Sequence, residues 1–239
     1  MAQSIVNTEL KSTDDNRKYF AEIEGAFEVQ KGNTELFEME SSVILGYNIN
    51  SKHLVKFIFG NTHLSEDSES IENDSYAQIR HNFKFSNNIK SFAFIQYQKN
   101  LNLLLMERFI SGGGIRYDTK QKHFDFGIGS GVMYENEVLF DDDLLQSEEN
   151  NTTTIRMAGL STISFSVNEV VSIHNTTYLQ PSFSNFFRDF RLLNELTLLI
   201  ELGEVLSLEN QFTFRHDSDP PSVLKEDDFA FMSGIVISF

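Results

Sequence analysis

The strongest constraint on this chain is a period-two alternation of apolar and polar residues, which is clearest in its last segment. From residue 228 to the end, one face carries Phe229, Phe231, Ile235, Ile237 and Phe239. Successive side chains of a β-strand point to opposite faces, so this pattern predicts a strand with one apolar face. The same alternation recurs from residue 19 onward, and we count about twelve such segments along the chain.

The connections between these segments alternate in length. Those near residues 50, 87, 120, 168 and 203 are short, whereas most of the others are longer and acidic, such as 65–75 and 141–149. Outer-membrane barrels have short periplasmic turns, longer outer loops and an even strand number, and a soluble sandwich has no reason to sort its loops in this way. We therefore predict an all-β, antiparallel, up-and-down transmembrane β-barrel of about twelve strands over residues 17–239, preceded by a flexible periplasmic arm over residues 1–16.

The composition fits strands and excludes several other classes of protein. The 239 residues include 23 Phe and only three Pro. Aromatic side chains favour a pleated sheet, whereas Pro interrupts its ladder. No run of about 18 apolar residues is present, so no transmembrane helix is expected. The net charge of −16 argues against nucleic acid as a partner, and the absence of Cys excludes disulfides and thiolate metal sites.

The start of the chain lacks the basic and apolar regions of a signal peptide, because Met1-Ala2-Gln3-Ser4 is followed by polar residues. Taken literally, this indicates the cytosol. We interpret Ala-Gln-Ser instead as lying near a mature N-terminus from which a signal peptide has been removed. On this interpretation the protein is located in the outer membrane of a Gram-negative bacterium, with outer-membrane lipid around it.

The last segment resembles the terminal strand of bacterial outer-membrane barrels. Phe231, Ile235, Ile237 and the final Phe239 stand at alternate positions, and the chain stops on an aromatic residue. In that class of protein such an end implies recognition by the barrel-assembly machinery, which the resemblance therefore suggests as a partner during insertion.

A second resemblance covers most of residues 17–239. The segments GAFEVQKGNTE, SGGGIRYD, GIGSGVMYE, TTYLQPSF and FRHDSDPP together resemble the DUF481 family, whose members include the so-called salt-induced outer-membrane proteins. The resemblance implies a barrel and brings no catalytic residue with it.

If the apolar faces meet lipid, the opposite faces line the interior of the barrel. An acidic wall opposite a basic wall would then create a transverse field that orients dipolar solutes, although the same charges could instead pair across a narrow interior and fill it. The expected interior charges are Glu22, Glu24, Glu28, Glu38, Glu40, Lys56, Arg80, Lys84, Arg108, Arg116, Asp125, Arg156, Arg191, Glu195, Glu209 and Arg215.

Other candidate sites are weaker. Ser172 and His174 share one face of a strand and could act as nucleophile and base, but no third residue that would orient the imidazole is identified. The acidic stretch 141–149 lacks EF-hand spacing, so we expect solvated loops there and no calcium site. The glycines of 112–114 and 127–131 precede no helix, so we expect them to let strands bend or approach closely. Four other histidines lie on different segments and show no metal-ligand spacing, namely His63, His81, His123 and His216. No cofactor is expected.

Three functions follow from a barrel of this kind. The first is a narrow passive channel for small solutes, with selectivity set by interior charge. The second is a closed structural or interaction barrel that docks another outer-membrane protein. A barrel hydrolase that uses His174 comes third, so we do not expect an enzyme.

Overall fold

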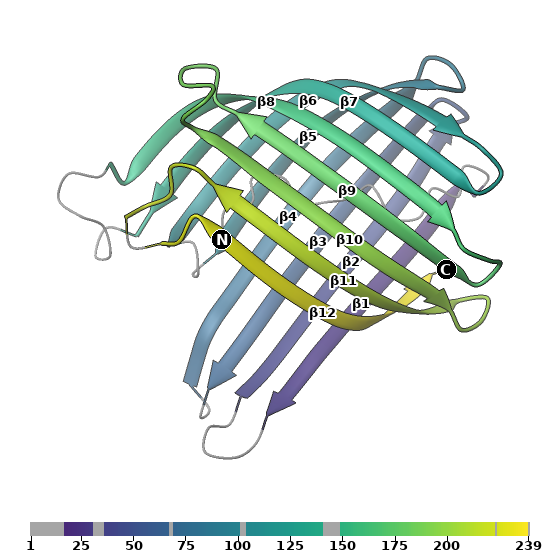
Figure 1. Cartoon of the computed structure of the whole chain (residues 1–239), viewed down its shortest axis with the longest axis horizontal. Coiled ribbons are helices and arrows are strands. Elements are labelled where there is room, and N and C mark those ends of the chain that lie inside the picture. Colours follow the sequence, from purple (N-terminus) through teal and green to yellow (C-terminus); the bar gives the residue numbers. More distant parts are fainter. Residues whose placement is uncertain are drawn as a thin grey trace.

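The computed structural model describes residues 17–30, 36–66, 69–100, 104–140, 149–222 and 224–238. Twelve antiparallel strands follow one another around a closed barrel, and β1 pairs with β12 (Figure 1). Among these residues no helix is long and apolar enough to span a membrane. The predicted twelve-stranded up-and-down barrel is confirmed. The strands are β1 (Tyr19–Gln30), β2 (Leu36–Asn50), β3 (His53–Glu66), β4 (Glu69–Lys84), β5 (Ile89–Asn100), β6 (Leu105–Lys120), β7 (Phe124–Leu139), β8 (Asn151–Ser166), β9 (Val171–Pro181), β10 (Phe190–Glu201), β11 (Leu206–Asp217) and β12 (Asp227–Ser238).

The two ends of the barrel differ, and we call them the short-turn end and the long-loop end. The short-turn end holds the tight turns β2–β3, β4–β5, β6–β7, β8–β9 and β10–β11, together with the start of β1 and the end of β12. Short polar side chains stabilise these turns. Asn50 Oδ1 accepts hydrogen bonds from the backbone N–H of Lys52 and His53, at 2.9 and 3.1 Å, and Asn168 does the same for Val170 and Val171.

The acidic stretch expected to form a loop over residues 65–75 is mostly strand. Ser65 pairs with Ser70, and Glu66 pairs with Glu69, so β3 and β4 continue almost to their connection. The prediction of a loop was wrong here because backbone pairing with the neighbouring strand does not require an apolar face once a hairpin leaves the hydrophobic layer. Figure 1 shows this hairpin, together with β1–β2, projecting beyond the other strands at the long-loop end.

Burial alternates along the strands, with apolar side chains mainly on the outer face. On β5, whose faces are ambiguous in the sequence, Ile95 and Tyr97 are about half exposed, whereas Phe94 and Gln96 are buried. On β12, Phe229 and Phe231 point outward and are 68% and 64% exposed. The outer surface therefore carries a broad apolar layer of the kind that faces lipid in membrane barrels.

The alternation alone suggested a uniformly polar inner face, but the inner face also carries apolar side chains. Two apolar clusters lie inside the barrel, because several inward positions carry large aliphatic or aromatic side chains. Interdigitation across the narrow interior removes these side chains from water. The larger cluster consists of Phe92, Phe94, Ile110, Met133, Ala158, Leu160, Tyr178 and Leu193, and the smaller one of Phe20, Ile44, Leu54 and Ile58 with Tyr76 packed against it.

Three inward aromatic rings each cover a glycine that faces them on the neighbouring strand. The pairs are Phe20 with Gly46, Tyr76 with Gly60, and Phe92 with Gly114. A Cβ built on any of these glycines would meet ring atoms closer than 3.0 Å. The absent side chains thus provide the space in which the rings lie flat against the wall.

The glycines of β6 and β7 also allow close backbone approach. Gly114 and Gly131 are paired in the register. A Cβ on Gly114 would lie 2.6 Å from Gly131 Cα and 2.3 Å from Ser130 O. This agrees with the structural role expected for the glycine runs, because only glycine fits between the two backbones at these positions.

The seam that closes the barrel is its shortest pairing. Among the described residues, which end at Ser238, β1 and β12 are paired from Glu22 opposite Ser238 to Gly25 opposite Ile235, which is four residue pairs, whereas β11 and β12 share eleven. Figure 1 shows β1 and β12 separating toward the long-loop end. Fewer ladder hydrogen bonds therefore hold this junction than hold its neighbours.

Replacing Gly114 by Ala is expected to lower the free energy of unfolding by about 1–3 kcal/mol, because the new methyl group forces two backbones and the Phe92 ring apart. The matched control is Gly25→Ala, since no atom lies within 4 Å of a Cβ built there. Urea unfolding of the barrel in lipid vesicles, followed by circular dichroism, measures both variants. Equal midpoints for the two would contradict the close approach.

The seam can be tested by cross-linking, which the absence of native Cys makes clean. A Cβ on Gly234 lies 3.0 Å from Ala26 Cβ. We expect an Ala26→Cys, Gly234→Cys double variant to form a disulfide that joins the first and last strands after small backbone adjustment. Non-reducing gel migration after heat unfolding detects the cross-link, and each single variant serves as the control. Failure to oxidise in the folded barrel would show that β1 and β12 do not meet at these positions.

Candidate functional site

The charged residues of interest lie on inward strand positions. Seven of the expected interior charges are buried: Glu22, Lys56, Arg80, Arg108, Arg156, Arg191 and Glu195. Seven more are half-buried: Glu24, Glu40, Lys84, Arg116, Asp125, Glu209 and Arg215. Glu28 and Glu38 have side chains outside the described part of the structure. Most of these charges gather into three groups with different chemistry.

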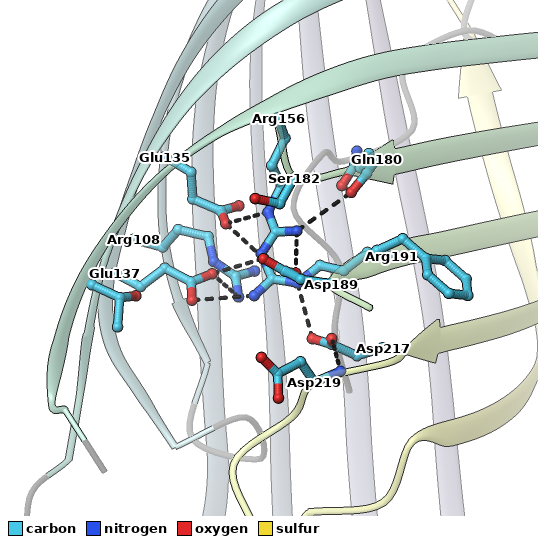
Figure 2. A network of polar contacts seen from close by, with 12 residues as sticks. Arg108, Glu135, Glu137, Arg156, Gln180, Ser182, Asp189, Arg191, Asp217 and Asp219 are labelled. Atoms are coloured by element: carbon cyan, nitrogen blue, oxygen red, sulfur yellow. Dashed lines mark hydrogen bonds and ion pairs between the residues drawn. The ribbon is translucent and has the colours of Figure 1, made fainter. Parts of the chain in front are cut away.

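The first group is a network of ion pairs near the long-loop end, which we call the Arg–carboxylate cluster (Figure 2). Arg191 lies at its centre. Its Nη1 is 2.8 Å from both Glu135 Oε1 and Glu137 Oε1, and its Nε donates to Asp217 Oδ2 at 2.9 Å. The members are Arg108, Glu135, Glu137, Arg156, Asp189, Arg191 and Asp217.

The cluster ties distant segments together. Arg156 on β8 reaches Glu135 at 3.0 Å and Asp189 at 2.6 Å, and Asp189 belongs to the connection between β9 and β10. Arg108 on β6 pairs with Glu137 on β7. Planar guanidinium groups suit such shared pairing because each offers five donors in a fixed fork.

The cluster excludes most water from its part of the interior. The paired side chains are between 2% and 17% exposed. Three arginines face four carboxylates, so a surplus of negative charge remains. Burial raises the pKa of Asp219, in the connection that follows β11, and the nearby Asp189 and Asp217 raise it further. The cluster thus places paired charges near this end, on the side formed by β6–β11.

Four of these residues were not among the expected interior charges: Glu135, Glu137, Asp189 and Asp217. Glu137 was missed because β7 runs on to Leu139, beyond the point where its apolar alternation weakens. Continuing the inward positions of β7 from Asp125 in steps of two would have found Glu135 and Glu137. Asp189 lies in a connection, where alternation carries no signal, whereas Asp217 is the last residue of β11 and continues its inward positions two residues after Arg215.

The second group surrounds an interior cavity of about 320 Å³ that we call the basic cavity. It lies toward the short-turn end, because Gln121, Lys122 and His123 of the β6–β7 turn help to line it. Deeper in, the Arg80 guanidinium stands 5.1 Å from the centroid of the Phe92 ring, which belongs to the larger apolar cluster. Six lining residues are cationic, namely Lys56, Arg80, Lys90, Arg116, Lys120 and Lys122, against the two acids Asp118 and Asp125.

The third group is acidic and lies on other strands. Glu24, Glu40 and Glu209, from β1, β2 and β11, line a small pocket of about 80 Å³ that no Lys or Arg lines. Ser42 donates a hydrogen bond to Glu24, and Thr62 donates one to Glu40 at 3.4 Å. The carboxylates of this pocket thus come from β1, β2 and β11, whereas the cations of the basic cavity come from β3–β6 and the β6–β7 turn.

The candidate hydrolytic pair is present as a hydrogen bond but without a triad. His174 Nε2 lies 2.9 Å from Ser172 Oγ, and its Nδ1 lies 2.9 Å from Ser164 Oγ. A catalytic triad places a carboxylate at that second nitrogen. Serine hydroxyl groups therefore contact both nitrogens of the ring and hold it in position.

The described residues contain no group of three or more His, Cys, Asp or Glu side chains that could hold a metal ion. Residues 141–148 of the acidic stretch lie outside the described ranges, and Glu149 at their edge is exposed.

His53 and His81 form a pair, with ring nitrogens 3.0 Å apart, on the outer face of β3 and β4.

Comparison with known proteins supports the fold. The barrel is similar to the NanC porin, with a TM-score of 0.56 at 10% identity, covering 91% of this chain and 98% of that one. It is also similar to the COG4313 outer membrane channel from Pseudomonas putida F1, with a TM-score of 0.55 at 9% identity over 92% and 94% of the two chains. A bacterial polysaccharide outer membrane secretin gives a TM-score of 0.51 at 7% identity over 92% and 97%.

The sequence identities are too low to transfer a function from these proteins. The structural similarity shows a shared fold alone. No curated protein is significantly similar to this chain in sequence. A family model, described as "Protein of unknown function, DUF481", matches residues 11–239. Since the match spans nearly the whole sequence, the chain belongs to the DUF481 family.

Proposed function

We propose that this protein is a narrow passive channel of the outer membrane for small charged solutes, with the Arg–carboxylate cluster as a gate near its long-loop end. The observation that carries the proposal is the interior itself. A charged cavity lies toward one end, and the Arg–carboxylate cluster lies near the other, where ion pairs can separate without leaving a packed apolar core exposed. The structural similarity to a porin and to an outer membrane channel supports it.

The location in the outer membrane rests on the apolar outer surface of the closed barrel. Residues such as Ile79, Ile128 and Phe212 are at least half exposed, which only a lipid environment makes favourable for so many large apolar side chains. The outward Phe231 and Ile235 of β12 would serve as the signal read by the barrel-assembly machinery during insertion.

A closed interaction barrel is the second candidate, and one observation favours it. The connection between β9 and β10 exposes Phe183, Phe186 and Phe187, the last of them 88% exposed, although its Asp189 anchors it to the Arg–carboxylate cluster. An anchored loop that presents aromatic rings suits the docking of another outer-membrane protein. Such a barrel would copurify with its partner in mild detergent and remain electrically silent.

The refolded protein is expected to give steady single-channel conductance in a planar bilayer. Heat-modifiable gel migration first establishes that the barrel is folded. Neutralising Arg116 to Gln should change the conductance and its ion selectivity, because this side chain lines the cavity, whereas Lys99→Gln on the exposed end of β5 should not. Silence from a folded barrel would exclude the channel and leave the interaction barrel.

The closing role of the cluster gives a separate prediction. Arg191→Leu is expected to destabilise the barrel by about 3–5 kcal/mol, because it leaves Glu135, Glu137 and Asp217 buried without their shared cation. It should also raise the open probability of the channel. Arg188→Leu, in the exposed β9–β10 connection, is the matched control. The closing role is wrong if Arg191→Leu lowers the unfolding midpoint in urea without altering conductance.

A further inference from the structure

We infer that the basic cavity is a binding site for a small anion that carries several carboxylate or phosphate oxygens. The inference concerns binding within the barrel and holds whether or not the barrel conducts.

The cavity concentrates positive charge although the chain as a whole is acidic. The whole chain has a net charge of −16 and only 19 Lys and Arg residues. Six of these 19 line this one cavity, against two carboxylates. A random distribution of such an acidic sequence would give an acidic cavity, so the concentration of cations here is a specific feature of the fold.

The two acids offset two of the six positive charges, so a formal surplus of four remains, and Asp118 also orients the cations. Asp118 pairs with Arg116 through one oxygen and with Lys90 through the other, at 3.3 Å for Lys90. Arg116 also donates to Thr162 Oγ1 at 2.7 Å. These contacts hold both cations in place along the wall, so that an incoming anion meets oriented charges.

The walls supply the remaining features of a ligand site. Arg80 is buried and stacked near Phe92, which fixes its guanidinium at the inner limit of the cavity. Hydroxyl groups of Ser91, Ser164 and Ser166 line the same space and can donate hydrogen bonds to anion oxygens. At about 320 Å³ the cavity has the size of a small-molecule pocket.

The approach to the site is also cationic. Lys120, Lys122 and His123 are exposed at the β6–β7 turn and line the cavity as well. A positive rim within a low-dielectric wall attracts anions and repels cations, an effect that salt screens over a Debye length of about 10 Å at 0.1 M. The geometry therefore points to an anion that enters from the short-turn end.

Isothermal titration calorimetry on the detergent-folded full chain tests the site, with citrate and inorganic pyrophosphate as probes and glycerol as the uncharged control. We expect saturable binding of at least one anion at low salt, weakened at least tenfold in 0.5 M salt, and no binding of glycerol. The Lys120→Gln, Lys122→Gln double variant should weaken binding at least tenfold, because it removes two of the six cations that line the cavity. Both side chains are exposed, so we expect the barrel to fold without them. Citrate and pyrophosphate together distinguish a carboxylate site from a phosphate site.

The control is Lys18→Gln, Lys52→Gln, which removes the same charge from exposed positions at the same end but outside the cavity. It should change the affinity less than threefold. No saturable binding of either anion, or equal losses in the two double variants, would overturn the proposal. Binding by a barrel that is silent in bilayers would leave the site standing and reject the channel, and conductance without binding would do the reverse.

Discussion

Hydrogen bonding between neighbouring strands is the constraint on which the rest of this structure depends. In a hydrocarbon layer no water pairs with an unpaired N–H or C=O, so a sheet must close on itself. The ladder is long everywhere except between β1 and β12, where four residue pairs complete the circle. Closure thus depends on the last strand, β12. Its outward aromatic residues also form part of the apolar outer surface.

Closing the sheet creates the second problem, which is how to fill a narrow interior. The chain uses two solutions along the same barrel. Apolar clusters around Phe94 and Ile58 remove large side chains from water, and the Arg–carboxylate cluster pairs charges that would be costly if left alone. Glycines opposite Phe20, Tyr76 and Phe92 provide the space that these rings need. Packing and ion pairing share the interior, and both make the wall rigid.

The unequal distribution of charge gives the interior a direction. Cations gather around the cavity near the short-turn end, paired charges lie near the long-loop end on the side formed by β6–β11, and an acidic pocket lies among β1, β2 and β11. Ion pairs of the network can exchange partners, whereas packed apolar groups cannot do so without opening a void.

The sequence by itself determined the number of strands, their order and most of the outward residues. Those properties depend on alternation within each segment, and Ile95 and Phe231 face outward for that local reason. Alternation failed where it carries no information. The polar segment 69–75 is strand through pairing with β3, and the inward Phe92 and Phe94 are apolar because they contact other inward residues. Only the tertiary structure decided which charges meet. Arg191 and Glu135 are 56 residues apart, and closure of the barrel brings them to 2.8 Å. Local sequence sets the direction of a side chain, but its partner across the interior is set by the curvature and register of all twelve strands together.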